Sequence, residues 1–173
     1  MYKMGIYTER VKEYEKAIFH FQRSYELYKK SREDSAKASA ESGNESASSN
    51  AEEDPGVANC LNMIGTCHLK LGNLKKAHEH LTRAYAIRKV LATSSDHTDI
   101  LSSKQALADY YDRVGDHYKA HQFKLDIFLM KRKLYEGRLS PDLAAAMSAL
   151  GASYLKLGDH KSALKFVQDS FEM

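Results

Sequence analysis

A fixed spacing of 43 residues constrains this chain more than any other feature of its sequence. Gly72, Gly115 and Gly158 stand 43 positions apart. Three alanines follow these glycines in the same register, at Ala77, Ala120 and Ala163. A fixed period of this size is typical of helical repeat arrays, in which each repeat buries its apolar face against its neighbours. We therefore predict an all-α solenoid built from helical hairpins.

One full period is easiest to see in residues 61–91, which predict a helix, a tight turn and a second helix. Apolar residues recur there at the three- and four-residue spacings of amphipathic helices. Gly72-Asn73 interrupts the pattern, and glycine adopts the left-handed conformation that a helix C-terminus needs without steric cost. Gly65 in the first helix is expected to let the second helix approach closely.

These positions resemble the tetratricopeptide repeat family. Gly65, His68, Gly72, Ala77, Leu81 and Ala84 match its small, aromatic, turn and alanine positions, with His68 where an aromatic residue is usual. The match recurs at Ala108, Tyr111, Gly115 and Ala120 and at Gly151, Tyr154, Gly158 and Ala163, whereas Lys124 and Ile127 depart from the second-helix pattern. The period exceeds the usual one of about 34 residues. Similar segments precede the first helix of each of the last three copies, at 54–63, 97–100 and 140–144. Together with the long period, these segments resemble the kinesin light chain and nephrocystin-like subclass, which implies a right-handed superhelix.

The repeats and the segment between them set the expected organisation of the chain. Residues 31–54 hold two basic and seven acidic side chains, a net charge of −5, and no aromatic or branched apolar residue. Such a segment cannot bury enough surface to offset its ordering entropy. We expect a flexible loop there, with frayed helix over 35–40 as the alternative. The expected divisions are a partial repeat at 1–30, the loop at 31–54, full repeats at 55–96 and 97–139, and a repeat with a truncated second helix at 140–173.

Several helix ends can also be predicted. Asp54-Pro55 and Ser140-Pro141 each combine an N-cap residue with a proline, which is tolerated at the first helical position. The second helices are expected at 74–91 and 118–135, with Gly137 ending the latter. In the last helix, Phe166, Val167 and Phe171 are expected to lie exposed.

Candidate binding residues follow from the family resemblance, which implies that the first helices line a concave surface that binds an extended peptide or a helix. Asn62 stands where the subclass often has an asparagine that bonds a peptide backbone, and Gln105 and Ser148 replace it in later copies. By repeat position the candidates are Asn59, Asn62, Met63, Thr66 and Lys70; Ser102, Gln105, Ala106, Asp109 and Arg113; and Ala145, Ser148, Ala149, Ala152 and Lys156.

A basic residue ends the first helix of every copy, at Arg10, Lys70, Arg113 and Lys156. These residues could form a ladder for an acidic ligand. They could equally stabilise the helix C-termini, where a cation contributes about 0.3–1 kcal/mol, and we favour this second interpretation. The family's clamp for C-terminal carboxylates is not expected, because Ser102 and Ala106 occupy two of its basic positions.

The sequence contains no constellation that predicts catalysis, so we expect no enzyme and no cofactor. His117 and His121 lie one helical turn apart and could share a metal ion, but no third ligand is placed beside them, and we expect solvated histidines instead. Cys60 and Cys67 lie two turns apart on one predicted helix, too far for a disulfide, and are expected to be small core residues in a reducing compartment.

The charge distribution and the targeting signals narrow the range of functions that we expect. The net charge is +3, so the acidic segment leaves a basic helical body that suits an acidic partner or a masking contact. The N-terminus lacks a signal-peptide core and no apolar run reaches the length of a membrane span, so a cytoplasmic protein is expected. We expect a non-catalytic scaffold or adaptor, and the resemblance implies roles in cargo transport or in cytoskeletal and ciliary assembly. Self-assembly through the repeat ends is one alternative. Polyanion binding by Lys131, Arg132 and Lys133 is another, with nucleic acid the less favoured partner.

Overall fold

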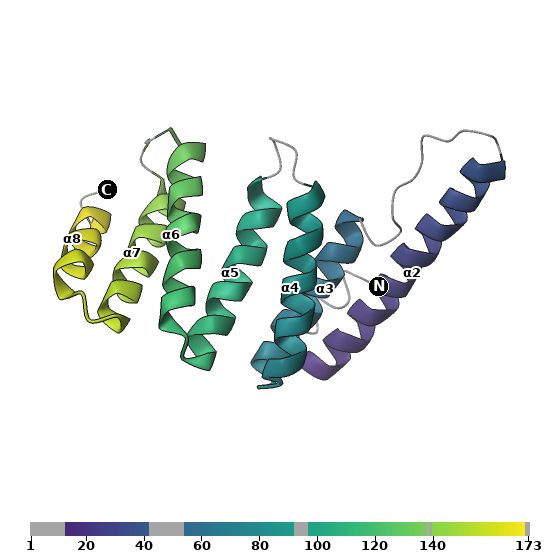
Figure 1. Ribbon diagram of the computed structural model, residues 1–173, viewed down its shortest axis with the longest axis horizontal. Coiled ribbons are helices and arrows are strands. Elements are labelled where there is room, and N and C mark those ends of the chain that lie inside the picture. The colour runs from purple at the N-terminus through teal and green to yellow at the C-terminus, as the bar shows by residue number, and fades with distance from the viewer. Residues whose placement is uncertain (1–12, 42–53, 92–96, 137, 139, 172–173) are drawn as a thin grey trace. The chain divides into compact units, whose positions relative to one another are not determined.

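The computed structural model describes residues 13–41, 54–91, 97–136, 138 and 140–171. Within these ranges every regular element is an α-helix (Figure 1). The chain divides into two compact units, residues 1–96 and 97–173. This arrangement of helical hairpins confirms the prediction of an all-α solenoid.

The first unit contains α2 (Tyr14–Glu41), α3 (Pro55–Lys70) and α4 (Leu74–Leu91). Helix α3 packs against both α2 and α4, so most of its residues are buried. Gly65 shows why the α3–α4 pair needs a small residue, because a Cβ there would lie 2.7 Å from Cγ of Leu81. The close approach predicted for Gly65 is therefore present.

The second unit contains α5 (His97–Val114), α6 (His117–Leu134), α7 (Pro141–Lys156) and α8 (His160–Phe171). Each of these helices packs against the next along the chain. The apolar core of this unit includes Ile127 and Phe128 of α6 and Leu143, Met147 and Leu150 of α7. These two helices therefore form the centre of the unit.

The turns and caps follow the expected backbone chemistry. Gly72, Gly115 and Gly158 have φ values of 78°, 85° and 81°, so all three adopt the left-handed conformation predicted for them. Oδ1 of Asp54 accepts hydrogen bonds from the backbone N–H groups of Gly56 and Val57, at 2.7 and 3.4 Å. Ser140 caps α7 in the same way, with its Oγ 3.3 Å from the N–H of Asp142.

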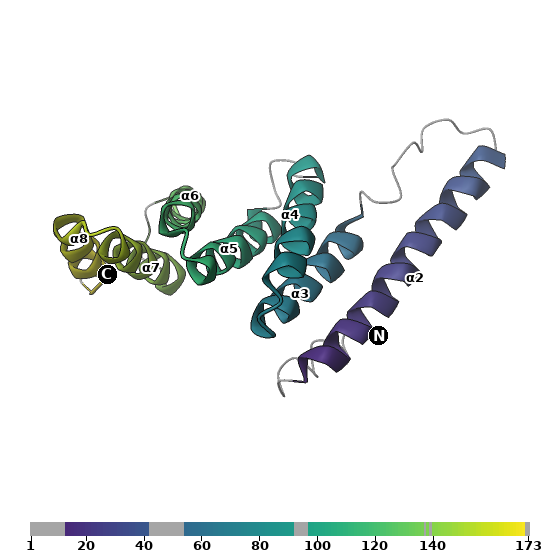
Figure 2. The same cartoon turned by 60° about the horizontal axis from the view of Figure 1, so that its bottom comes forward.

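The start of the expected acidic loop is helical. Helix α2 continues through residues 31–41, so the prediction of a loop over all of 31–54 is wrong for this part, while residues 42–53 lie outside the described ranges. Alanine, glutamate, lysine and arginine favour helix even where they bury nothing. Arg32 also anchors this end of α2, since its Nε lies 2.9 Å from Oδ2 of Asp54. Figure 2 shows how far α2 extends past the start of α3.

The ends of the last two hairpins differ in detail from the predictions. Helix α6 spans His117–Leu134 rather than 118–135 and ends before Glu136, which has a φ of 49°. Phe166 is not exposed as expected, because its ring stacks on Tyr154 at 5.5 Å and meets the edge of Phe128 at 5.7 Å. Val167 is half-buried beside Gly151, whereas Phe171 is 87% exposed.

Candidate functional site

In the first unit, α3 presents one narrow, partly exposed strip. Its members are spaced four, three and four residues apart, which places them on a single face of the helix: Asn59, Met63, Thr66 and Lys70. All four belong to the predicted peptide-binding set. Lys70 is the most exposed of them, whereas Met63 also packs against the buried cluster around Phe21 and Ile64.

Asn62 does not belong to this strip. Its side chain is only 3% exposed, because α3 lies between two packed helices and residue 62 faces the covered side. Asn59 is held by a neighbour, since a guanidinium N–H of the buried Arg88 in α4 donates a hydrogen bond to its Oδ1. The amide ladder expected from Asn62 is therefore not exposed in this unit, and Asn59 is fixed in orientation.

In the second unit, two exposed strips lie on α5 and α7. The α5 strip consists of Ser102, Gln105, Asp109 and Arg113, and the α7 strip consists of Ala145, Ser148, Ala152 and Lys156. Ala106 is 8% exposed and belongs to the core rather than to the predicted surface. Gln105 donates a hydrogen bond of 2.9 Å to Asp109, so the two polar side chains of the α5 strip are held together.

A small hollow lies between these two strips. It has a volume of about 90 Å³ and is lined by Gln105, Lys124, Ile127, Lys131, Ala145, Ala146 and Ala149. The small side chains of the three alanines leave space on the α7 side of the hollow. Ile127 of α6 forms its apolar floor. The hollow thus joins two predicted binding strips into one surface that has an apolar centre and a polar rim.

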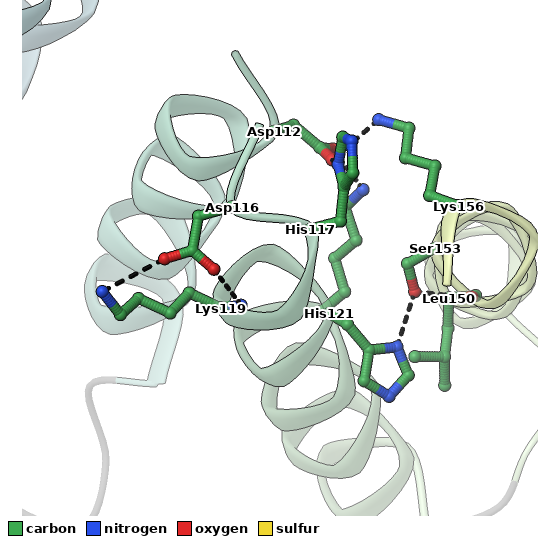
Figure 3. Close-up of polar contacts among 9 residues, drawn as sticks. Asp112, Asp116, His117, Lys119, His121, Leu150, Ser153 and Lys156 are labelled. Atoms are coloured by element: carbon green, nitrogen blue, oxygen red, sulfur yellow. Dashed lines mark hydrogen bonds and ion pairs between the residues drawn. The ribbon is translucent and has the colours of Figure 1, made fainter. Parts of the chain in front are cut away.

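Asp112 anchors the helices beneath this surface. Its carboxylate contacts Lys124 Nζ from α6, Lys156 Nζ from α7 at 2.7 Å, and Nδ1 of His117 at 3.6 Å (Figure 3). Burial raises the pKa of Asp112, but the hydrogen bonds from Lys124 and Lys156 lower it by more, so the carboxylate stays charged. This charge cluster fixes three helices of the second unit relative to one another.

The two histidines considered as metal ligands have separate partners. His117 lies beside Asp112, whereas Nδ1 of His121 lies 2.9 Å from Oγ of Ser153 (Figure 3). The Ser153 hydroxyl donates to the carbonyl of Leu150 at 2.6 Å, so Nδ1–H of His121 is the donor to Ser153. Burial and the charge of Lys124 lower the pKa of His121, which favours a neutral ring. Within the described ranges no three His, Cys, Asp or Glu side chains gather as metal ligands.

Some of the predicted basic residues are engaged in contacts within the chain. Lys156, a member of the expected ladder, pairs with Asp112, while Lys70 and Arg113 lie in the last turns of their helices as predicted. Arg10 lies outside the described ranges. In the basic run of α6, Arg132 lies over the ring of Phe128 at 5.6 Å, and Lys131 donates to the carbonyl of Asp142 at 3.2 Å.

The sequence contained a signal for the Asp112 cluster that the prediction did not use. Lys124 stands 43 positions after Leu81, which is fully buried, and is itself only 8% exposed. A lysine in a buried register requires a carboxylate partner nearby. The sequence therefore indicates that Lys124 has an acidic partner, and the structure identifies it as Asp112 among the three aspartates of α5.

Comparisons with known proteins agree with this architecture. A profile of the tetratricopeptide repeat family matches residues 57–99. Among solved structures, BtubC (BKLC) from P. vanneervenii has a TM-score of 0.73 at 23% identity and covers 99% of this chain. A protein from Podosopora anserina, described as a kinesin light chain with nearly identical TPR-like repeats, has a TM-score of 0.75 at 16% identity and covers 98%. MamA protein has a TM-score of 0.52 at 17% identity.

The chain spans 60% of the length of BtubC and 71% of the Podosopora anserina protein. No curated protein matches the sequence significantly. At these identities the structural neighbours show the fold, an α-solenoid of helical hairpins. None of the helices described here is long and apolar enough to cross a membrane.

Proposed function

We propose that this chain, whose helical hairpins are tetratricopeptide repeats with kinesin light chain-like character, holds a peptide or a helix of a partner protein on its first helices. The observation that carries the proposal is the hollow of about 90 Å³ between the exposed strips of α5 and α7. Its alanine wall and isoleucine floor suit one apolar side chain of a ligand. Gln105 and Lys131 at its edge are suited to hydrogen bonds with a ligand backbone or an acidic side chain.

The partly exposed strip of α3 is the second surface that we assign to binding. Met63, Thr66 and Lys70 offer an apolar, a hydroxyl and a cationic contact at helical spacing. Such a binding role is general for the family and involves no catalysis. The finer proposal is an adaptor or scaffold in the cytoplasm that works in cargo transport or cytoskeletal assembly, supported by the likeness to a solved structure described as a kinesin light chain.

A peptide array tests the proposal on the full chain. Discrete peptides should bind, and Gln105→Ala or Ala149→Leu should weaken their binding about tenfold, since the first removes a rim donor and the second fills the hollow. Gln122→Ala is the matched control, because Gln122 is an exposed glutamine of α6 that does not line the hollow. Absence of binding, or equal loss with Gln122→Ala, would refute a site at the hollow.

Self-association is a second candidate function, favoured by exposed apolar side chains on α8. Phe171 is 87% exposed and Leu164 is 60% exposed, on a helix where Ala163 is the one buried residue among those described. If this surface mediates self-association, the full chain should sediment as a dimer or a larger species. Leu164→Glu should then return it to a monomer, whereas a wild-type monomer at high concentration would exclude this candidate.

A further inference from the structure

In the outer half of α2, the side chains of Tyr28 and Arg32 contact residues at the start of α3. Ser24 is 3% exposed, and no residue in the described part of α2 after it is buried. The ring of Tyr28 lies against Gly56, where an added Cβ would be 2.6 Å from the ring. Arg32 follows one turn later, with its Nε 2.9 Å from Oδ2 of Asp54. Exposed helical turns with so little packing open locally at low cost.

Ser31 lies at the start of these exposed turns. Its side chain is exposed, and Glu33 and Asp34 follow it at the second and third positions. Protein kinases that select acidic sequences read carboxylates on the C-terminal side of the serine through basic residues of their own. The hydroxyl of Ser31 is therefore accessible, lies in a part of the helix that opens easily, and is followed by carboxylates.

We propose that Ser31 is a phosphorylation site for an acid-directed protein kinase, and that the phosphate releases the end of α2 that Arg32 ties to Asp54. In the reaction, Oγ of Ser31 forms a bond to the γ-phosphorus of ATP while the bond from that phosphorus to the bridging oxygen breaks. ADP leaves, and the hydroxyl proton passes to the base of the kinase. This inference does not depend on the proposed peptide site.

Local charge explains why a phosphate would loosen the helix. The group carries a charge of about −1.5 to −2 at neutral pH. On a helix, residue 31 faces residues 27, 28, 34 and 35, which are Leu27, Tyr28, Asp34 and Ser35. None of these four is a cation, and Asp34 repels the phosphate. Lys30, which lines the same surface hollow as Ser31 and Asp34, attracts the phosphate and offsets part of this repulsion.

Asp54 is the residue through which a change in α2 could affect α3. Its Oδ1 caps α3 while its Oδ2 faces Arg32, so one carboxylate joins the two helices. When residues 31–38 unwind, Arg32 is no longer held opposite Asp54. The cap on α3 is retained, because its hydrogen bonds come from the backbone of α3 itself. Phosphorylation would therefore free the end of α2 and leave the α3–α4 hairpin folded.

The experiment treats the full chain with a purified acid-directed kinase and ATP, then maps phosphate by mass spectrometry. Ser31 should be phosphorylated, and Asp34→Ala should slow its phosphorylation about tenfold. Ser42 and Ser49 serve as internal references, since each also has an acid three residues on. Phosphate on Ser42 or Ser49 with none on Ser31 would refute the site.

Amide hydrogen exchange tests the structural effect. Exchange in residues 31–38 should become at least fivefold faster in the phosphorylated chain and in Ser31→Glu, with no change in α4. Ser35→Glu is the matched control for added charge, because Arg32 lies three residues before it and can pair with it. Unchanged exchange in phosphorylated Ser31, or an equal effect of Ser35→Glu, would show that Ser31 does not act as the proposed release point.

Discussion

The imidazole of His68 in α3 stacks on that of His80 in α4, with ring centroids 5.6 Å apart and planes 10° from parallel. His68 is 7% exposed, so it fills the position where the family resemblance implies an aromatic ring. Burial lowers the pKa of both histidines, and the charges of Lys76 and of the partner ring lower that of His68 further. At His80 the negative charge of Glu79 raises the pKa, whereas the positive charge of Arg83 lowers it further.

Acid should therefore destabilise the first unit. A histidine whose pKa is lower in the folded state binds more protons when unfolded, so its contribution to stability is present above the unfolded pKa of about 6.5 and is lost as pH falls below it. The unfolding temperature, followed by circular dichroism, should fall between pH 7 and pH 5. His68→Phe should reduce this dependence because it keeps a ring and removes the proton site. His160→Gln, at an exposed histidine of α8, should leave it unchanged; equal pH profiles for His68→Phe and the wild type would contradict the prediction.

Asp112 should be essential to the stability of the second unit. Asp112→Asn leaves the ammonium of Lys124, which is 8% exposed, without a carboxylate partner. Removing one member of a buried ion pair costs about 3 kcal/mol. Lys156→Ala removes an exposed partner of the same carboxylate and should cost under about 1 kcal/mol. Urea unfolding measures both, and adding Lys124→Met to Asp112→Asn should recover much of the loss. Equal costs for the two single variants would show that burial of Lys124 is not the cause.

Gly65→Ala should destabilise the α3–α4 hairpin. The new Cβ would lie 2.7 Å from Cγ of Leu81 and 3.1 Å from its backbone nitrogen, so a side chain and a helix backbone would both have to move. Overpacking of this kind costs about 1–3 kcal/mol. The double variant with Leu81→Ala should be more stable than the sum of the two single effects predicts, because the side-chain clash is gone. If the losses in free energy of unfolding simply add, the cost of Gly65→Ala does not come from a clash with the Leu81 side chain.

The features that sequence predicts best here are those set by one residue and its immediate neighbours. Gly72, Gly115 and Gly158 require no tertiary information, since a helix C-terminus followed at once by another helix needs a left-handed residue. Asp54 and Ser140 cap their helices for the same local reason. The repeat register then aligns the hairpins, which is why the solenoid itself could be predicted.

The candidate site was less predictable, because side-chain exposure depends on which neighbouring helix covers each position. Asn62 is buried because α3 has helices packed on two sides. Phe166 is covered because Tyr154 and Phe128 meet it from other helices. Lys124 departs from the repeat pattern, but its partner Asp112 becomes evident only when α5 and α6 are folded against each other. Repeat periodicity supplies the helix faces and also the stacked pair of Tyr154 and Phe166, which recurs 43 residues earlier as Tyr111 and Phe123. The pair of Lys124 and Asp112 instead depends on a departure from the period.

The two cysteines of α3 should report on opening of the first unit. Cys60 and Cys67 are both fully buried, and burial together with the charge of Asp54 raises the pKa of Cys60 to about 11. The thiolate is the reactive form, so folded chain at pH 8 should not react with a thiol reagent, whereas unfolded chain should react at two sites. Ser148→Cys supplies an exposed reference thiol on α7 that should react within the first minutes. Destabilising variants such as Gly65→Ala should speed labelling of Cys60 without changing that reference, and rapid labelling of Cys60 in the wild type would show that α3 is not covered as described.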